Sequence, residues 1–225
     1  MSFLKKPWGN PSGAYGTFTS NYSDEQKKQI KDKIGLSNPD LGVKIFYGRR
    51  GWVSVSNISE VLAFYYIGPY IAEHTGFKIP TPPVKLSFSA LCASKAIMTQ
   101  AIKGKTLNDT EIGSYVNGAD VHYALLEIGV AWYDYNDNNI MLEQKVIDHI
   151  ESMDAKAGLS WKEKYELAME NLWIIDFGAM KCDEGTQPGQ QLMKLKRKLE
   201  SLQNNLPQYN SIIQDIIAAI DNTIL

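Results

Sequence analysis

Cysteine and long apolar runs are scarce in this sequence of 225 residues. It contains only two cysteines, Cys92 and Cys182, too few for a disulfide scaffold, so a reducing compartment is expected. The most apolar run, 61–72, is interrupted by Gly68 and Pro69 and falls short of the roughly 18 apolar residues that a membrane span needs. No apolar segment of a secretory signal peptide is visible at the start of the chain. We therefore expect a soluble, cytoplasmic protein without a membrane span.

An excess of charge of one sign is also missing. Lys and Arg total 23 against 25 Asp and Glu, a formal net charge of −2. Neither nucleic acid nor an anionic membrane surface is expected as a partner, because both require a strongly basic surface. The hydrophobic share of 44% is typical of globular proteins, and no repeat or low-complexity tract is present. The chain is long enough to bury a substantial core.

Residue patterns predict a strand-rich first half with one prominent helix and a mostly helical second half. In the first half we expect a strand, a Gly-rich turn and a returning strand within residues 1–20, a helix over 25–35, a strand over 41–47, a helix over 57–76 that Gly68-Pro69 bends or breaks, and strands over 82–90 and 95–102. In the second half we expect a helix over 121–132, a strand over 138–143, helical structure over 148–172 interrupted at Gly158, a strand over 172–176, an irregular stretch over 177–189, and two closing helices.

Two acidic clusters stand out at the ends of predicted strands. In the segment YDYNDNNIML, Asp134 and Asn139 are five positions apart, and further on Asp176 ends an apolar strand and is followed by Phe177 and Gly178. A strand that delivers a carboxylate and is followed by glycine suits a Mg²⁺ site, because Mg²⁺ prefers oxygen ligands and needs space for phosphate groups. Each cluster by itself is weak evidence.

The order of these motifs resembles that of the eukaryotic-type protein kinase family, whose catalytic loop H-R-D-L-x-x-x-N precedes a D-F-G. In that family the loop aspartate orients the acceptor hydroxyl and accepts its proton, and the resemblance assigns this role to Asp134. It assigns Mg²⁺ binding to Asn139 and Asp176. ATP and Mg²⁺ are the implied cofactors.

The upstream half carries further elements of the same family in the expected order. The segment PSGAYGTF resembles the Gly-rich loop, with Pro11 in place of its first glycine. The resemblance implies nucleotide contacts from this segment, with Tyr15 at the loop tip and Phe18 over the adenine, and its contact residues would be Gly13, Tyr15, Gly16 and Phe18.

A lysine, a glutamate and a hinge follow this loop. Lys44 stands where the family's phosphate-binding lysine belongs, and Glu60 follows 60 − 44 = 16 positions later on a helix, as a partner for an ion pair. By the same register, Thr99 would be the gatekeeper residue. The backbones of Gln100 and Ile102 would meet the adenine. We therefore predict an α+β, two-lobed, protein-kinase-like domain, with an N-lobe over 1–103 and a reduced helical C-lobe over 104–225.

Several departures from the family pattern qualify the resemblance. Trp132 and Tyr133 replace the usual His-Arg before the aspartate, and Asn136 replaces a lysine that is common in Ser/Thr kinases. The 36 residues between Asn139 and Asp176 imply a helical insert. Only 47 residues follow the D-F-G motif, and no A-P-E motif appears. The pattern is similar to minimal kinases among bacterial effectors injected into host cells and among viral kinases, and we expect a protein partner that completes the missing surface.

Three functions remain open at this point. The favoured one is Mg²⁺- and ATP-dependent phosphoryl transfer to Ser or Thr hydroxyls of a protein substrate. A small-molecule kinase and a nucleotide-binding pseudokinase that acts through a partner are the alternatives. Two weaker motif interpretations concern a Ca²⁺ loop starting at Asp134 and a phosphate-binding loop around 104–106; each lacks required glycine or glutamate positions. Cys182 is expected to be a buried small residue.

Overall fold

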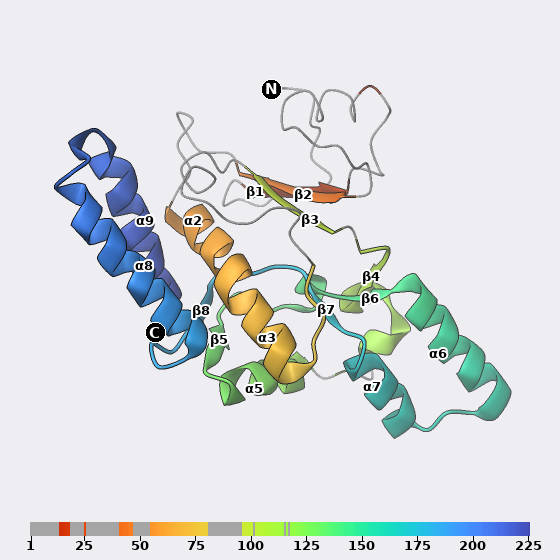
Figure 1. Cartoon of the computed structure of the whole chain (residues 1–225). Coiled ribbons are helices and arrows are strands. Elements are labelled where there is room, and N and C mark those ends of the chain that lie inside the picture. Colours follow the sequence, from red (N-terminus) through yellow and green to blue (C-terminus); the bar gives the residue numbers. More distant parts are fainter. Residues whose placement is uncertain are drawn as a thin grey trace. The chain divides into compact units, whose positions relative to one another are not determined.

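The computed structural model describes residues 14–18, 25, 41–46, 55–80, 96–100, 102–114, 116 and 118–225 (Figure 1). Within these residues the protein is mixed α/β, with small sheets and mostly helical content, which confirms the predicted class at this coarse level. The chain divides into two compact units, one of residues 1–54 and 80–102 and the other of residues 55–79 and 103–225. Among the described residues, no helix has the length and apolar character required to cross a bilayer.

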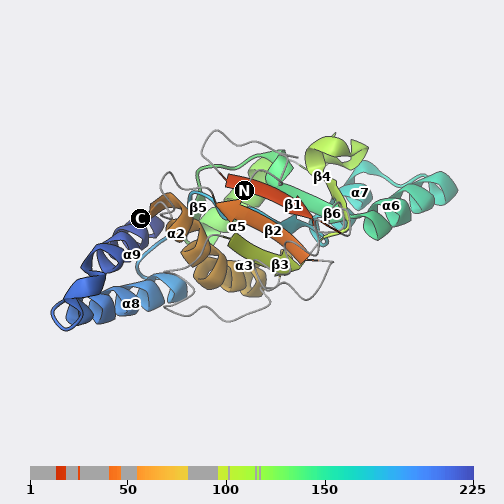
Figure 2. The same cartoon turned by 90° about the horizontal axis from the view of Figure 1, so that it is seen from above.

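The first unit contains a three-stranded antiparallel sheet with the order β1-β2-β3. Its strands are β1 (Ala14–Phe18), β2 (Leu41–Phe46) and β3 (Ala96–Gln100), and Figure 2 shows them side by side with β2 in the middle. The predicted strands over 41–47 and 95–102 are thus confirmed within one or two residues. Apart from Glu25, the helix predicted over 25–35 lies outside the described residues, as does the strand predicted over 82–90.

A continuous helical segment opens the second unit. It consists of α2 (Val55–Leu62), the π-helical turn η3 (Ala63–Ile67) and α3 (Gly68–Thr75). Of the predicted bend or break at Gly68-Pro69, the break is wrong, because the helical backbone continues through both residues. Proline cannot donate a backbone hydrogen bond and its ring collides with the carbonyl four residues earlier. The carbonyl four residues before Pro69 is that of Tyr65, which lies in the wider π turn η3.

Helix α5 (Gly118–Glu127) ends earlier than predicted, and a strand follows it. The sequence pattern predicted one helix over 121–132, but Gly129 adopts φ +74° and residues 130–132 form β5 (Val130–Trp132). That strand pairs antiparallel with β8 (Met180–Cys182), which lies inside the stretch predicted to be irregular. Both errors share one cause, because a short apolar segment becomes a strand only when a distant partner pairs with it.

Gly129 is required both by its backbone conformation and by its neighbours. A Cβ placed there would lie 2.8 Å from Asp183 Oδ2 and 2.8 Å from Thr186 Cγ2. We expect Gly129→Ala to lower the free energy of unfolding by about 2 kcal/mol or more, through left-handed strain and this crowding. Gly158→Ala is the matched control, since Gly158 has φ +63° but nothing within 4 Å of the added Cβ. Urea unfolding of both variants measures the difference, and equal losses would contradict the steric part of the argument.

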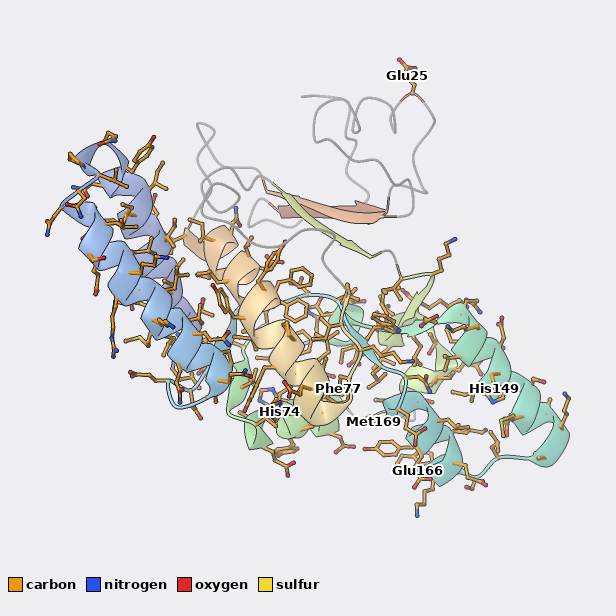
Figure 3. The ribbon with its side chains drawn as sticks, in the orientation of Figure 1. Glu25, His74, Phe77, His149, Glu166 and Met169 are labelled. Carbon is orange, nitrogen blue, oxygen red and sulfur yellow. The ribbon has the colours of Figure 1, made fainter. Side chains whose placement is uncertain are left out.

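The helical insert predicted between Asn139 and Asp176 is present. Strand β6 (Ile140–Glu143) leads into α6 (Gln144–Ala157) and α7 (Trp161–Met169), and the chain returns as β7 (Trp173–Ile174). Gly158 ends α6 in the left-handed conformation, and Ser160 begins α7 with a capping box that includes Glu163. Figure 3 shows His149 on α6 and Glu166 on α7. Strands β4 (Gly104–Thr106), β6 and β7 form a small antiparallel sheet at the base of this insert.

Two antiparallel helices close the chain, as predicted. Helix α8 (Gln187–Gln203) and helix α9 (Asn210–Thr223) pack together, and α9 also packs along α2 (Figure 1). The Ser59 hydroxyl on α2 lies 3.1 Å from the Ala219 carbonyl on α9, and the Lys196 ammonium lies 2.6 Å from the Asp221 carboxylate. The backbone N–H of Leu225 donates to the carbonyl of Cys182 on β8. The C-terminal helices therefore support both α2 and the strand that follows the Asp-Phe-Gly motif.

Candidate functional site

The loop that connects β5 to β6, residues 133–139, folds on itself through local hydrogen bonds. The amide Nδ2 of Asn139 donates to the backbone carbonyl of Asp134 at 3.0 Å, and the backbone N–H of Asn139 donates to the carbonyl of Asn136 at 2.9 Å. The side chain of Asn136 accepts from the N–H of Asn138 at 3.0 Å and begins the short 3₁₀ turn η6 (Asp137–Asn139). Two of the predicted site residues, five positions apart in sequence, are thereby held together, and the Asp134 side chain is left exposed to solvent.

The second acidic cluster joins this loop directly. The backbone N–H of Ile175 donates to the carbonyl of Asn139 at 3.0 Å, which places Asp176 next to the end of the loop. The Asp176 carboxylate accepts a hydrogen bond from the backbone N–H of Gly178 at 2.9 Å. Three predicted site residues, Asp134, Asn139 and Asp176, therefore occupy one continuous hydrogen-bonded region of the second unit.

Phe177 anchors the Asp-Phe-Gly segment in the hydrophobic core. Its side chain is 3% exposed and packs edge-on against Phe64 of η3, with 5.1 Å between ring centroids. It also lies against Gly68, where an added Cβ would come 3.2 Å from the Phe177 ring. The conformation of Asp176 is thus tied to the helical segment 55–75 through its buried neighbour.

Glu60, on the same helical segment, also lies close to this motif. Among the side chains that the structure describes, it is the only charged one that is buried. A Cβ placed on Gly178 would lie 3.9 Å from the Glu60 Oε2 and 3.2 Å from the Asp176 Oδ1. Both carboxylates therefore flank Gly178. A buried carboxylate is retained only where polar or positively charged partners compensate its desolvation.

The oxygen atoms of the Asn139 and Asp176 side chains, where the loop 133–139 meets the Asp-Phe-Gly segment, fit Mg²⁺ better than a transition metal. No three His, Cys, Asp or Glu side chains converge on one point within the described residues, as a closed protein metal site requires. Mg²⁺ is usually held by one or two carboxylates together with phosphate oxygens and water. Asp176 supplies a carboxylate, and Asn139, whose Nδ2 is used by Asp134, has its Oδ1 as the amide atom suited to a metal.

The predicted nucleotide-binding residues lie in the other unit. Lys44 is in β2, opposite Gly16 on one side and Ile97 on the other. The prediction that Tyr15 lies at a loop tip is wrong, because Tyr15 is inside β1 and pairs with Ile45. Tyr15 is therefore part of a paired strand, and β1, at the edge of the sheet, shares its ladder hydrogen bonds with β2. The ion pair of Lys44 with the helix glutamate stays a prediction.

The remaining residues of that prediction are distributed along the same sheet. Phe18 ends β1, while Thr99 and Gln100 end β3. Ile102 follows β3 and is buried, at 5% exposure. Gly13 lies outside the described residues.

The interpretation of residues 104–106 as a phosphate-binding loop is wrong. These residues form β4, paired with β6, and not a loop ahead of a helix. A Cβ on Gly104 would overlap the carbonyl oxygen of Leu142, so this glycine serves close strand packing. The Ca²⁺-loop interpretation also loses a ligand, because the Asn136 oxygen is used inside the turn.

Sequence reasoning missed an aromatic cluster behind the loop. Trp132, which is 1% exposed, packs edge-on against Tyr135 with 5.4 Å between ring centroids, and the His122 ring lies 6.3 Å from Tyr135. The Tyr135 hydroxyl donates to the Asp137 carboxylate at 2.7 Å, and burial together with this carboxylate raises the pKa of Tyr135 far above its ordinary value. Buried Trp132 Nε1 and His122 Nδ1 have no hydrogen-bond partner within the described part of the chain. No local signal in the sequence points to the contact between Asp137 and Tyr135.

Cys182 is the buried small residue that the sequence predicted. Its thiol lies 3.8 Å from the Thr223 carbonyl, and burial raises its pKa to about 11. An unfolded thiol loses its proton near pH 8.5, so above that pH the folded state binds more protons than the unfolded state. We therefore expect stability to fall between about pH 8.5 and 11 by on the order of 1 kcal/mol per pH unit.

Comparison with Cys182→Ala isolates this contribution from those of other groups. Urea unfolding of both proteins across pH 7.5–10 should show a difference in unfolding free energy that shrinks as the pH rises. A difference that stays constant with pH would contradict the assigned cause.

Comparisons with known proteins add little to these residues. No protein-family model and no curated protein match the chain. One of ten matching chains of solved structures comes from a co-crystal structure of WbdD and the kinase inhibitor LY294002, with 12% sequence identity and a TM-score of 0.35. The match covers 82% of this chain and 41% of that chain, so this chain spans less than half of the matched one.

Proposed function

We propose that this chain is a minimal protein-kinase-like phosphotransferase that transfers the γ-phosphoryl group of ATP to Ser or Thr hydroxyls of a protein. The observation that carries this proposal is the hydrogen-bonded junction of Asp134, Asn139 and Asp176. Phosphoryl transfer needs this combination of one carboxylate that faces solvent and an adjacent pair of oxygen ligands for a metal. The proposal includes a two-lobed fold, in which residues 55–79, predicted to belong to the N-lobe, group with residues 103–225.

Each residue of the junction has a defined task in this proposal. Asp134 accepts the proton of the attacking Ser or Thr hydroxyl while the hydroxyl oxygen forms a bond to the γ-phosphorus. ADP leaves with the electrons of the broken P–O bond. Asp176 and Asn139 hold Mg²⁺, which neutralises charge on the phosphates when bound. Lys44 binds the phosphates, and Glu60, buried beside Gly178, orients Lys44.

A small-molecule acceptor is favoured by one specific feature. The position two residues after Asp134 holds Asn136, whose side chain oxygen is used by the N–H of Asn138. It supplies no cation toward an acceptor, unlike the lysine that is common at this position in kinases that act on Ser and Thr. A pseudokinase that acts through a protein partner is the further alternative.

Label transfer from γ-labelled ATP separates these possibilities. The purified chain is incubated with Mg²⁺ and either a protein lysate or the small-molecule fraction of the same lysate, and Mg²⁺-ATP binding is measured in parallel by thermal shift. Labelled protein supports the favoured function, and label confined to small molecules supports the alternative acceptor. Binding without any transfer would support a pseudokinase, and the absence of both binding and transfer would overturn the proposal.

A further inference from the structure

We infer that Tyr135 is a positioning residue for the proposed reaction, and that its hydroxyl bond to Asp137 holds the loop 133–139 in the shape that presents Asp134 and Asn139. The inference rests on the proposed function for its kinetic consequence. Its structural part, the conformation of the loop, is measurable without any activity.

The Tyr135 side chain contacts residues of β5, α5 and η6. Its ring packs edge-on against Trp132 at 5.4 Å and lies 6.3 Å from the His122 ring of α5. Its hydroxyl donates to the Asp137 Oδ1 at 2.7 Å. The side chain thus connects β5 and α5 to the 3₁₀ turn that ends in Asn139. Anchoring a turn to two packed elements restricts the conformations that its short loop can adopt.

Gly118, at the start of α5, lies directly against the Tyr135 side chain. A Cβ added to Gly118 would overlap the Tyr135 hydroxyl and ring. No side chain other than hydrogen is compatible with the observed position of the tyrosine, so α5 and the loop are matched to each other at this point. The close fit, together with the hydroxyl bond, leaves Tyr135 a single well-defined position.

The consequence for the candidate site follows from the loop's own bonds. Asp137 is the first residue of η6, and Asn139, its last, bonds to the carbonyl of Asp134 and, through its own carbonyl, to Ile175. A shift of Asp137 therefore moves both the metal ligand Asn139 and the backbone that carries Asp134. In the family the sequence resembles, an arginine precedes the loop aspartate, but here that position is Tyr133, which is 68% exposed.

The test compares Tyr135→Phe with Tyr123→Phe, the same change at a tyrosine of α5 that is 64% exposed. The first readout is hydrogen exchange of the backbone N–H groups of Asn139 and Ile175, which donate to carbonyls of this loop. We expect exchange in Tyr135→Phe to be about tenfold faster, as the loss of one hydrogen bond to a charged group implies. Tyr123→Phe should match the wild type.

The second readout separates positioning from general stability. In Tyr135→Phe, kcat should fall about tenfold and the KM for Mg²⁺-ATP should rise with it, because Asp134 and the proposed metal ligand Asn139 are displaced together, whereas Tyr123→Phe should leave both unchanged. Asp137→Asn keeps a carbonyl oxygen that can accept from Tyr135 but removes its charge, so its loss should be smaller than that of Tyr135→Phe. Asp137→Ala cannot accept this bond, and it should behave like Tyr135→Phe.

The outcomes separate the structural role of Tyr135 from the proposed phosphotransferase function. Unchanged exchange at Asn139 and Ile175 in Tyr135→Phe would overturn this inference, whatever the activity of the protein. Faster exchange without any label transfer by the wild type would support the structural role of Tyr135 and overturn the proposed function. Gly118→Ala should repeat the effect of Tyr135→Phe, whereas Gly185→Ala, with nothing within 4 Å of the added Cβ, should not.

Discussion

Asp134→Asn is expected to lower the rate of label transfer by about 10²- to 10⁴-fold, the usual contribution of a general base. The substitution keeps the size of the side chain and removes only the carboxylate that accepts the proton. The loop itself should persist, because Asn139 bonds to the backbone carbonyl of residue 134 and not to its side chain. Asp134 is exposed, so neutralising it costs little in stability.

Two measurements make this prediction specific. Mg²⁺-ATP binding by thermal shift should be unchanged in Asp134→Asn, since the proposed metal ligands are Asn139 and Asp176. Asp148→Asn is the matched control, because Asp148 is an exposed carboxylate on α6 that accepts a hydrogen bond from Gln144. Full transfer by Asp134→Asn would show that Asp134 is not the base, and equal losses in both variants would indicate an unspecific effect.

Trp132→Ala is expected to have the largest effect on stability, about 3–5 kcal/mol of the free energy of unfolding. The side chain is 1% exposed, lies in β5 opposite Met180 and packs against Tyr135. Its removal leaves a cavity at the point where the two-stranded sheet meets the aromatic cluster. Removing Nε1, which has no hydrogen-bond partner within the described residues, relieves some of this loss and places the result near the lower end.

The control is the same substitution at an exposed tryptophan. Trp161 on α7 is 58% exposed and stacks on Tyr165 with 5.4 Å between ring centroids, so Trp161→Ala should cost about 1 kcal/mol. Urea unfolding followed by far-ultraviolet circular dichroism avoids the change in tryptophan fluorescence that each substitution causes. Similar losses in the two variants would contradict the burial argument.

Local patterns were sufficient for several elements of this protein. The helical insert was predicted from the 36 residues between Asn139 and Asp176 and from the helical pattern over 148–172 with its interruption at Gly158, and the structure confirms the two helices. The spacing of Asp134 and Asn139 likewise predicted one loop, and the hydrogen bond between them confirms their proximity. Such features depend on residues a few positions apart, whose interactions form without the rest of the chain.

Other elements depend on partners that are distant in sequence. The stretch before Trp132 reads as the end of a helix, and it is a strand only because β8 pairs with it. Residues 104–106 resemble part of a phosphate-binding loop, yet pairing with β6 makes them a strand. The apolar content of these short segments suits a helix, a strand or a buried loop equally well, so tertiary contacts make the choice.

By itself, the sequence determined which residues are candidates for the site and in what order they occur, because motifs are defined by spacing along the chain. Tertiary structure alone decided which of them meet: that Glu60 and Asp176 flank Gly178, and that Tyr135 connects α5 to the loop of Asp134. The physical reason is that such contacts form between elements far apart in sequence, where packing and the satisfaction of buried polar groups set the geometry.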